Sequence, residues 1–330
     1  MPQPTGSDLH IDTYLSNLGI AYLNAPSSYI ADDVFPVVLV DHRSDLYPIY
    51  QKDYWFRDEA KKRALLTESA GGGYELKDPG TYYCHHVAFH KDIPDQDIWN
   101  QDDVFDLEDD ATSFTIEKLR LYREHLWATN YFQPGIWGNN VVGGVNFVQW
   151  GAGAGAGNPI TDMENWKRLV HQTTGLKPNT LVVSGRVHQT VKNNDEIVER
   201  YKYTRGGVIT AEILASIFEI DRYIVGDALL ALNEEGDPQD LQYILQENSA
   251  LLVYSAPRPS RRRPSGGYTF RWRRPRIGGR YGERLPATIK KWYMTEVEGT
   301  RVEGNIYEDL KLVAADCGVF ISNIAEDVGS

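Results

Sequence analysis

The sequence is poor in cysteine and contains no long hydrophobic run. Its 330 residues include only Cys84 and Cys317, too few for a disulfide framework and typical of a protein kept in a reducing compartment. No stretch reaches the roughly 18 apolar residues that a membrane-spanning helix needs. The start of the chain, MPQPTGSDLHIDTYL, has neither the basic nor the apolar region of a signal peptide. We therefore expect a soluble protein that is not exported and has no membrane partner.

The common catalytic motifs are also missing. The sequence contains no GxSxG, HExxH or CxxC motif, and no GxGxxG motif after a predicted strand. Carboxylates around residues 102–110 could in principle bind Mg²⁺ or Ca²⁺, but capping of a helix explains them without a metal. We therefore predict a protein that is not an enzyme and needs no cofactor.

One segment has the residue types of a metal site. YYCHHVAFHKD, residues 82–92, contains Cys84, His85, His86 and His90. Its aromatic and β-branched residues indicate a strand, in which successive side chains point to opposite faces and residues rise about 3.3 Å each. His85 then faces away from the others, and His90 lies roughly 20 Å from Cys84. Only Cys84 and His86 could share a zinc ion, which would need two more ligands, so we favour a solvated strand face.

Charge is distributed unevenly. The net charge is −12, yet residues 258–284 carry ten arginines against one glutamate, a local charge of +9 that leaves −21 for the rest of the chain. Many acidic residues fall within residues 92–110. A chain with such separated charges could attract nucleic acid or copies of itself.

Two functions compete for the arginine-rich segment. It could anchor DNA, because arginine binds phosphate bidentately, or it could join subunits through the acidic residues. We favour subunit contact, because strand alternation in YTFRWRR puts Arg271 and Arg273 on one face and Phe270 and Trp272 on the other. The candidate arginines are Arg261, Arg262, Arg263, Arg271, Arg273, Arg274 and Arg276. The candidate acidic partners are Asp102, Asp103, Asp106, Asp109 and Asp110.

Residues 51–82 are predicted to form a projecting hairpin. FPVVLV, DLYPIYQKDYWF and YELKDPGTYYCHHVAFHKDI favour extended structure, and the polar segment RDEAKKRALLTESAGGG separates the last two. A tip this polar cannot join the hydrophobic core of its own subunit. A long hairpin with unpaired strand edges can instead pair with another molecule. We expect a neighbouring subunit to contact the tip residues Arg57, Asp58, Glu59, Lys61, Lys62, Arg63 and Glu68.

A long helix is predicted at residues 106–131. Acidic residues crowd its N-terminal end, where negative charge suits the helix dipole, and Pro134 with Gly135 ends it. GAGAGAG, residues 151–157, favours a flexible connector over a phosphate-binding loop, because the GKS or GKT of such a loop is missing.

An α/β module is predicted at residues 158–255. Thr161 and Glu164 have the spacing of a capping box that opens a helix, and GRVHQTVKNNDEIVERY and ITAEILASIFEI each favour a further helix. LKPNTLVVS and DRYIVGDALLAL favour strands, and the sequence after the arginines favours two or three more.

The order of these parts resembles the major capsid proteins of tailed double-stranded DNA phages, whose Hong Kong 97-like fold is shared with encapsulin shells. The resemblance covers most of the chain from Leu9 onward. The stretches that carry it are SNLGIAYLNAPSSYIADDVFP, RDEAKKRALLTESAGGGYEL, DDATSF, NPITDMENWKRLVHQTTGLKPNTLVVS, GYTFRWRRP and EDLKLVAADCGVFISN.

The resemblance implies an α+β fold with five parts. These are an N-terminal arm with the first peripheral strands (1–50), an extended β-hairpin loop (51–82), a peripheral domain (83–157) with a spine helix at about 106–131, an α/β axial domain with the arginine-rich segment (158–284), and terminal strands completing both domains (285–330).

The resemblance also implies a function. Such a protein self-assembles into hexamers and pentamers of an icosahedral virion shell that encloses double-stranded DNA, and it assembles in the host cytoplasm. Its partners are other copies of itself, a portal, DNA and a separate scaffolding protein, because no fused scaffold precedes the arm; a decoration protein is compatible with it. Two alternatives remain open: an encapsulin-type compartment, and a nucleic-acid-binding or zinc-dependent protein.

Overall fold

The described residues form two compact units. The computed structural model describes residues 24–50, 52–100, 106–153, 155–202, 209–233, 240–258, 264–273 and 288–326. The smaller unit contains the described residues of 1–28, 86–123 and 278–306, and the larger unit those of 29–85, 124–277 and 307–330. Strand β4 (His85–Pro94), helix α5 (Leu107–Tyr131) and strand β13 (Gly299–Leu312) contribute residues to both units.

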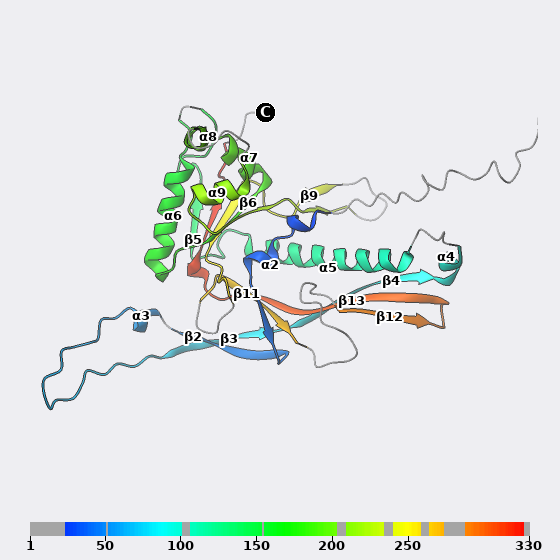
Figure 1. The fold of residues 1–330 in the computed structure, drawn as a ribbon, viewed down its shortest axis with the longest axis horizontal. Coiled ribbons are helices and arrows are strands. Elements are labelled where there is room, and N and C mark those ends of the chain that lie inside the picture. Colours follow the sequence, from blue (N-terminus) through cyan, green and yellow to red (C-terminus); the bar gives the residue numbers. More distant parts are fainter. Residues whose placement is uncertain are drawn as a thin grey trace, which may run out of the picture. The chain divides into compact units, whose positions relative to one another are not determined.

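The larger unit contains a five-stranded mixed sheet in the order β5-β14-β10-β6-β7. Figure 1 labels two of its strands, β5 and β6. Its strands are β5 (Asn139–Val142), β14 (Gly318–Ser322), β10 (Ser249–Val253), β6 (Thr180–Ser184) and β7 (Arg222–Gly226). The β5–β14 and β6–β7 pairs are parallel, and β10 is antiparallel to both of its neighbours. The central strands β6 and β10 are buried along their whole length, as their apolar sequences TLVVS and SALLV lead one to expect.

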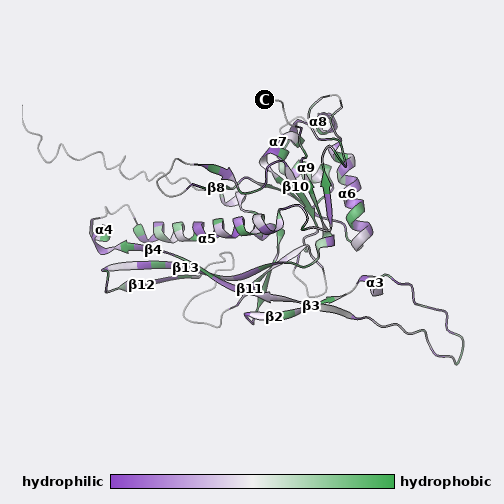
Figure 2. Cartoon of the chain, turned by 180° about the vertical axis from the view of Figure 1, so that it is seen from behind, coloured by the Kyte–Doolittle hydropathy of each residue, from purple (hydrophilic) through white to green (hydrophobic). Residues whose placement is uncertain are grey.

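Alternate residues of this sheet enter two different cores. Leu181 and Val183 join a core formed with α6 (Pro159–Thr174), α7 (Gly185–Asn193), α8 (Asp195–Lys202) and α9 (Ala211–Ile217). Val182 points the other way, into a core with Trp127 and Phe132 at the end of α5 and with α2 (Ala31–Val34). Figure 2 shows hydrophobic and hydrophilic residues alternating along α6, as expected for a helix with one face against a sheet.

Helix α6 begins earlier than the capping box predicted. Its N-cap is Asn158, whose side-chain oxygen accepts the backbone N–H groups of Ile160 and Thr161 at 3.0 Å each. Pro159 occupies the first turn, where no N–H donor is needed. The Thr161 capping box is therefore wrong, because Asn158 is itself a strong cap and is followed directly by proline.

The glycine-rich segment is hydrogen-bonded at both of its ends, and its role as a flexible connector stays a prediction. Buried Asn194 donates its side-chain N–H groups to the carbonyls of Gly151 (2.9 Å) and Gly157 (3.2 Å). Asn194 itself is extended and separates α7 from α8, so the single helix expected at residues 185–201 is in fact two. The single strand predicted at DRYIVGDALLAL is likewise two strands, β7 and β8 (Leu229–Ala231). Strand β8 pairs with β9 (Leu241–Tyr243).

A second set of strands in the larger unit includes the predicted hairpin. β1 (Val37–Val40) is parallel to β11 (Gly267–Trp272), which is antiparallel to residues 308–312 of β13. β2 (Ser44–Tyr50) pairs with β3 (Leu76–Tyr83) around a register shift between Tyr47 and Ile49. The expected strand does not continue beyond Tyr50, because Lys52–Trp55 forms the short helix α3. Of two short 3₁₀ helices, Ala315–Cys317 belongs to the larger unit and Pro26–Ser28 to the smaller one.

The smaller unit packs the first part of the long helix on three strands. β12 (Thr288–Met294) and β4 both pair with β13, and α4 (Asp95–Asn100) follows β4 directly. Ile93, Ala111 and Val302 form the buried core of this unit. Gly304 permits a close approach, because a Cβ there would lie 2.7 Å from side-chain atoms of both Leu119 and Thr115 on α5. The helix predicted at 106–131 is confirmed as α5, with Asp106 as its first capping residue.

Candidate assembly surfaces

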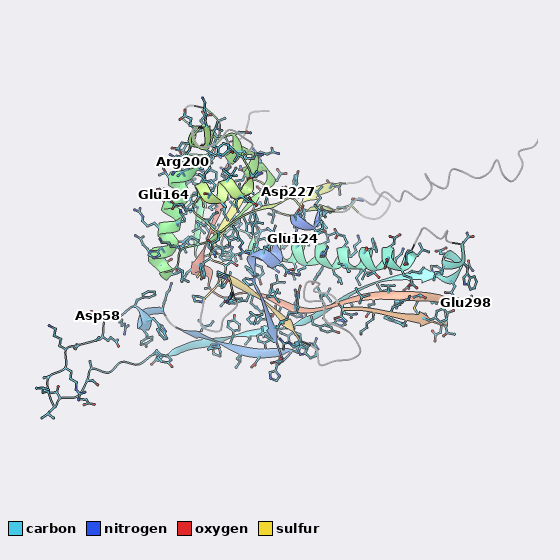
Figure 3. The ribbon with its side chains drawn as sticks, viewed as in Figure 1. Asp58, Glu124, Glu164, Arg200, Asp227 and Glu298 are labelled. Carbon is cyan, nitrogen blue, oxygen red and sulfur yellow. The ribbon has the colours of Figure 1, made fainter. Side chains whose placement is uncertain are left out.

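The tip of the hairpin is a long exposed loop. Residues 56–75 join α3 to β3, and Figure 1 shows them extending beyond the ends of β2 and β3. Leu65 is 95% exposed and Leu66 is fully exposed. The structure brings the predicted tip residues together on this loop, and all of them are exposed: Arg57, Asp58 (labelled in Figure 3), Glu59, Lys61, Lys62, Arg63 and Glu68. Their contact with a neighbouring subunit stays a prediction.

The base of the hairpin, by contrast, is buried against β11. The Tyr82 ring stacks on Phe270 at 4.5 Å between centroids, and the Tyr47 ring stacks on it from 5.4 Å. The backbone N–H of Tyr83 donates to the carboxylate of Asp309 at 2.8 Å. Burial, reinforced by the Asp309 charge, raises the pKa of Tyr47. These contacts fix where the hairpin leaves the larger unit.

Contacts around helix α3 attach the hairpin to the rest of the larger unit at a second place. Lys52 forms an ion pair with Asp316 and donates to the carbonyl of Thr173 at 3.2 Å. The ring of Phe56 lies against Gly175, where a Cβ would come within 2.8 Å of it. Beyond these contacts, the rings of Trp55 and Tyr74 lie 5.8 Å apart across the neck of the loop.

Arg271 is engaged within its own chain. Its guanidinium lies 3.0 Å from the carboxylate of Glu308 and 3.7 Å from that of Asp32, and its side chain is only 18% exposed. The predicted alternation of β11 is visible here, since Phe270 is buried in the core beside the hairpin and Arg271 pairs with the residue opposite it on β13.

The other candidate arginines give less structural information. Arg273 is exposed and its backbone N–H donates to Val40 at 2.7 Å. Five members of the predicted set lie outside the described residues: Arg261, Arg262, Arg263, Arg274 and Arg276. The choice between a subunit contact and a DNA contact therefore stays a prediction.

Three of the candidate acidic residues belong to the start of α5. Asp106 accepts the backbone N–H groups of Glu108 (3.0 Å) and Asp109 (3.2 Å), as an N-cap does. Asp109 and Asp110 are exposed in the first turn, where negative charge suits the helix dipole. Asp102 and Asp103 lie outside the described residues.

Within the part of the chain that the structure describes, no three His, Cys, Asp or Glu side chains are grouped so as to hold a metal ion. His86 lies 2.6 Å from the side-chain oxygen of Asn305, and His90 lies 4.0 Å from Asp92. Cys84 is buried, and its pKa is raised to about 11, first by burial and then by the Asp309 charge. The same described residues include no helix with the length and apolar character to cross a membrane.

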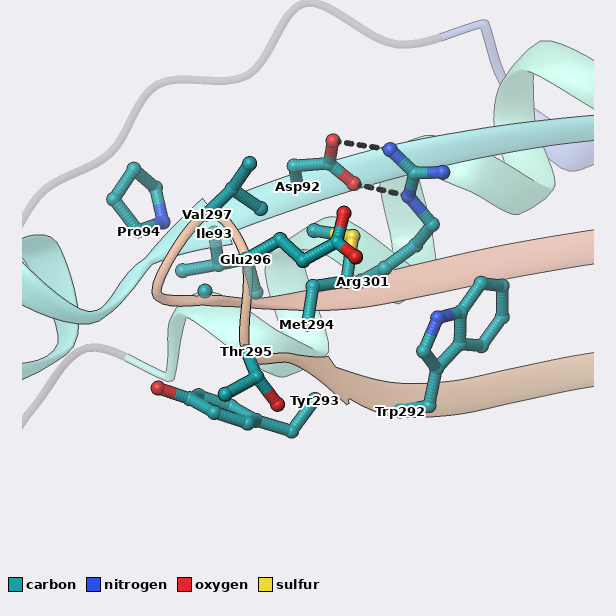
Figure 4. A pocket seen from close by; sticks show the side chains of 11 residues that line it. Asp92, Ile93, Pro94, Trp292, Tyr293, Met294, Thr295, Glu296, Val297 and Arg301 are labelled. Atoms are coloured by element: carbon teal, nitrogen blue, oxygen red, sulfur yellow. Dashed lines mark hydrogen bonds and ion pairs between the residues drawn. The ribbon is translucent and has the colours of Figure 1, made fainter.

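A groove in the smaller unit was not predicted from the sequence. It has a volume of about 720 Å³ and lies where the end of β4 meets the β12–β13 turn (Figure 4). Its apolar lining includes Ile93, Trp292, Met294 and Val297, of which Val297 is 65% exposed. We call this the turn groove.

Acidic groups border the turn groove. Asp92 pairs with Arg301 across β4 and β13 through two hydrogen bonds of 2.6 and 2.7 Å (Figure 4). The hydrogen bond from Arg301 lowers the pKa of Asp92. Glu296 lines the groove and Glu298 adjoins it, and within the described residues neither forms an ion pair. The sequence signal for this surface is that TIKKWYM favours a strand, and this cannot show that Asp92 lies opposite Arg301.

Comparison with known proteins connects this fold to viral shells. No family model matches the chain. The chain is 29% identical over 269 residues to the major capsid protein of Burkholderia phage BcepMu, an alignment that covers 79% of this chain and 83% of the relative. The sequence is thus similar to that of a phage major capsid protein.

Solved structures agree on the Hong Kong 97-like fold. A phage-related protein from Bordetella bronchiseptica RB50 superposes with a TM-score of 0.66 at 19% identity, over 91% of this chain and 94% of that one. The capsid of cyanophage P-SCSP1u gives a TM-score of 0.61 at 12% identity, over 99% and 97% of the two chains. Encapsulins share the fold. The chain is thus a capsid-forming protein of the phage type, and both the resemblance and the fold class inferred from the sequence are confirmed.

Proposed function

We propose that this capsid protein is the subunit of an icosahedral phage shell. It assembles into hexamers and pentamers that enclose double-stranded DNA in the virion, and assembly takes place in the host cytoplasm. Its role is structural and not catalytic. A separate scaffolding protein and a portal are its further partners, and a decoration protein is compatible with the shell. The likeness to a phage major capsid protein supports this proposal over an encapsulin-type compartment.

The observation that carries the proposal is the hairpin. Its base is packed into the larger unit through Tyr82 and Phe270, whereas the twenty residues 56–75 are exposed. Ordering so long a loop without burying it costs conformational entropy, which a contact with another subunit would offset. Exposed ion pairs contribute only about 0–1 kcal/mol each, so a single tip contact stabilises the shell little and many such contacts must act together.

The contacts of Arg271 lie within its own subunit and therefore favour neither a contact between subunits nor a contact with DNA. Arg271 contacts Glu308 and Asp32, so it helps to hold the subunit together. Reversing its charge would place a third carboxylate beside these two and damage the fold, whichever partner the segment has. A test of the arginine-rich segment therefore has to use exposed Arg273. Arg273→Glu should impair assembly of empty shells if the segment joins subunits, and only DNA retention if it faces the genome.

The test of the proposed function is deletion of residues 60–70. The wild-type protein should form closed shells by negative-stain electron microscopy, and the deletion variant should stay folded by circular dichroism but form none. Normal shells from the deletion variant would exclude the clamp, and a wild-type protein that forms no shells even when it is produced together with its scaffolding protein would exclude the capsid role. DNA that co-purifies with native particles, as opposed to a cargo enzyme, distinguishes a phage shell from an encapsulin.

A further inference from the structure

We propose that a cavity at the carboxyl ends of β6 and β7 binds a small aliphatic amine as its ammonium cation. The cavity has a volume of about 380 Å³, and its walls include Ser184, Asp227, Tyr243 and Glu247. We call it the strand-end cavity. Its lining residues all belong to the larger unit, so the inference concerns a ligand of the single subunit and goes beyond the proposed function.

The topology of the sheet places the strand-end cavity where α/β sheets commonly bind ligands. β6 and β7 are parallel neighbours, and their last residues, Ser184 and Gly226, lie opposite each other. Helix α7 begins directly after β6, and Asp227 (labelled in Figure 3) follows β7. Side chains from successive loops converge beyond the carboxyl ends of parallel strands, and ligands bind there. A volume of about 380 Å³ falls in the range of small-molecule sites.

Ser184 is a buried polar residue of this cavity. It is 2% exposed, and its hydroxyl oxygen forms no hydrogen bond within the described residues. Its side chain shares a face of the sheet with the residue opposite, Gly226, where a Cβ would lie 2.2 Å from a side-chain carbon of Leu245. Ser184 therefore faces the segment that supplies Tyr243 and Glu247 to the cavity. Leaving a buried hydroxyl unpaired is unfavourable, and an N–H donor bound in the cavity would pair it.

The charged groups of the cavity favour a cation over an anion. Asp227 and Glu247 are both exposed at its wall, and neither forms an ion pair with another described residue. Arg186 is the one lining residue with a fixed positive charge, so the negative groups outnumber it. The pKa of His188 is lowered, first by burial and then by Lys192, so this imidazole is uncharged at neutral pH.

The first turn of α7 does not offer a site for an anion. A Cβ at Gly185 would lie 2.7 Å from a carboxylate oxygen of Asp227, so this carboxylate already lies close to the N-terminus of the helix. Negative charge is favourable at that position, and it would repel a second anion. An ammonium group is attracted instead, because its charge meets Asp227 and Glu247 while its N–H groups donate to the hydroxyl of Ser184.

The remaining walls are compatible with an aliphatic chain. Leu229 is partly buried, Tyr243 is 50% exposed, and both line the cavity. Burial of methylene groups against such side chains is favourable, and the face of an aromatic ring attracts a cation. The same chemistry has two sources, since a free aliphatic diamine and the lysine side chain of a peptide both carry an ammonium group on a methylene chain.

Isothermal titration calorimetry of the full-length protein tests the site with both sources. Putrescine represents the free diamine, and Nα-acetyl-lysine methylamide represents a lysine side chain. At least one of them should bind to one site per chain, and butanediol, an uncharged alcohol of the same length as putrescine, should not bind. Tighter binding of putrescine would assign a free amine to the cavity, and tighter binding of the lysine compound would assign a peptide. Absence of binding by both amines would overturn the proposal.

Variants locate the binding in the strand-end cavity. Asp227→Asn or Glu247→Gln should weaken binding about tenfold, because each replaces a charged acceptor by a neutral group of the same shape. Ser184→Ala should weaken it about threefold, through loss of one neutral acceptor. The matched control is Glu164→Gln with Glu199→Gln, two exposed acids on α6 and α8, and it should leave the affinity unchanged. Wild-type affinity in both Asp227→Asn and Glu247→Gln would exclude the cavity.

Carbodiimide coupling of the wild-type protein keeps the proposal testable if the variants do not fold. A water-soluble carbodiimide joins an amine to an adjacent carboxylate as an amide, so dilute putrescine should label Asp227 or Glu247 before Glu164 and Glu199. Peptide mass spectrometry measures the labelling, and equal labelling of the four carboxylates would overturn the proposal. Shells that assemble normally from a protein that binds neither amine would refute this inference alone and leave the proposed function in place.

Discussion

The base and the tip of the hairpin differ in burial. At the base, Tyr82 is 6% exposed and stacks on Phe270, and Cys84 is fully buried. At the tip, Leu65 and Leu66 have almost no contact with the rest of the chain. The base is therefore specified by the fold of the subunit, whereas the tip is not. Changes at the base should act on the stability of the subunit, and changes at the tip should act on assembly.

The largest effect is expected from Phe270→Ala at the base. Phe270 is 6% exposed and contacts the rings of Tyr47, Tyr82 and Tyr268. Removing a buried aromatic ring should lower the free energy of unfolding by about 3–5 kcal/mol. Urea denaturation of dissociated subunits, followed by tryptophan fluorescence, measures it. Leu66→Ala is the control and should change stability by less than about 0.5 kcal/mol; a loss below about 1 kcal/mol for Phe270→Ala would contradict the comparison.

The buried thiols at Cys84 and Cys317 should make stability fall at alkaline pH. Burial raises the pKa of each thiol to about 11 in the fold, whereas an unfolded cysteine ionises near pH 8.5. Because the folded pKa is the higher one, this contribution is complete below about pH 8.5 and is lost as the pH rises toward 11. A Cys84→Ser variant should show a shallower decline in unfolding free energy over this range. Rapid labelling of both native thiols with iodoacetamide at pH 8 would contradict the assigned burial.

Local patterns in the sequence were enough to predict α5 and the hairpin, because each is defined by residues close together in the chain. The N-terminus of α6 was mispredicted, since Asn158 and Thr161 are both suitable caps and only the structure shows that the helix includes Pro159. The turn groove was missed for a different reason. Asp92 and Arg301 meet only because β4 and β13 pair, and no local pattern encodes that pairing. The overall architecture came from the resemblance of whole segments to capsid proteins.

A smaller effect is expected between base and tip, at Lys52. Its ion pair with Asp316 joins side chains that are 48% and 52% exposed, and such pairs contribute about 0–1 kcal/mol. Lys52→Ala should lower the free energy of unfolding by no more than about 1 kcal/mol, and most of that loss should disappear in 1 M salt, where the Debye length is about 3 Å. A loss that is unchanged by salt would assign the effect to packing of the lysine stem instead of its charge.

The smallest effect on stability, and the sharpest test of the comparison, is expected from Lys61→Ala combined with Lys62→Ala at the tip. Both side chains are exposed and neither forms an ion pair within the described residues, so the free energy of unfolding should change by less than about 0.5 kcal/mol. Assembly should nevertheless slow, because positive charges that steer association are lost, and the difference from wild type should shrink as salt is added. Urea denaturation and light scattering of the same preparations measure the two quantities. If the double variant lost more than about 1 kcal/mol of stability while assembling at the wild-type rate, the tip would belong to the fold of its own subunit, and the contrast with the base would be lost.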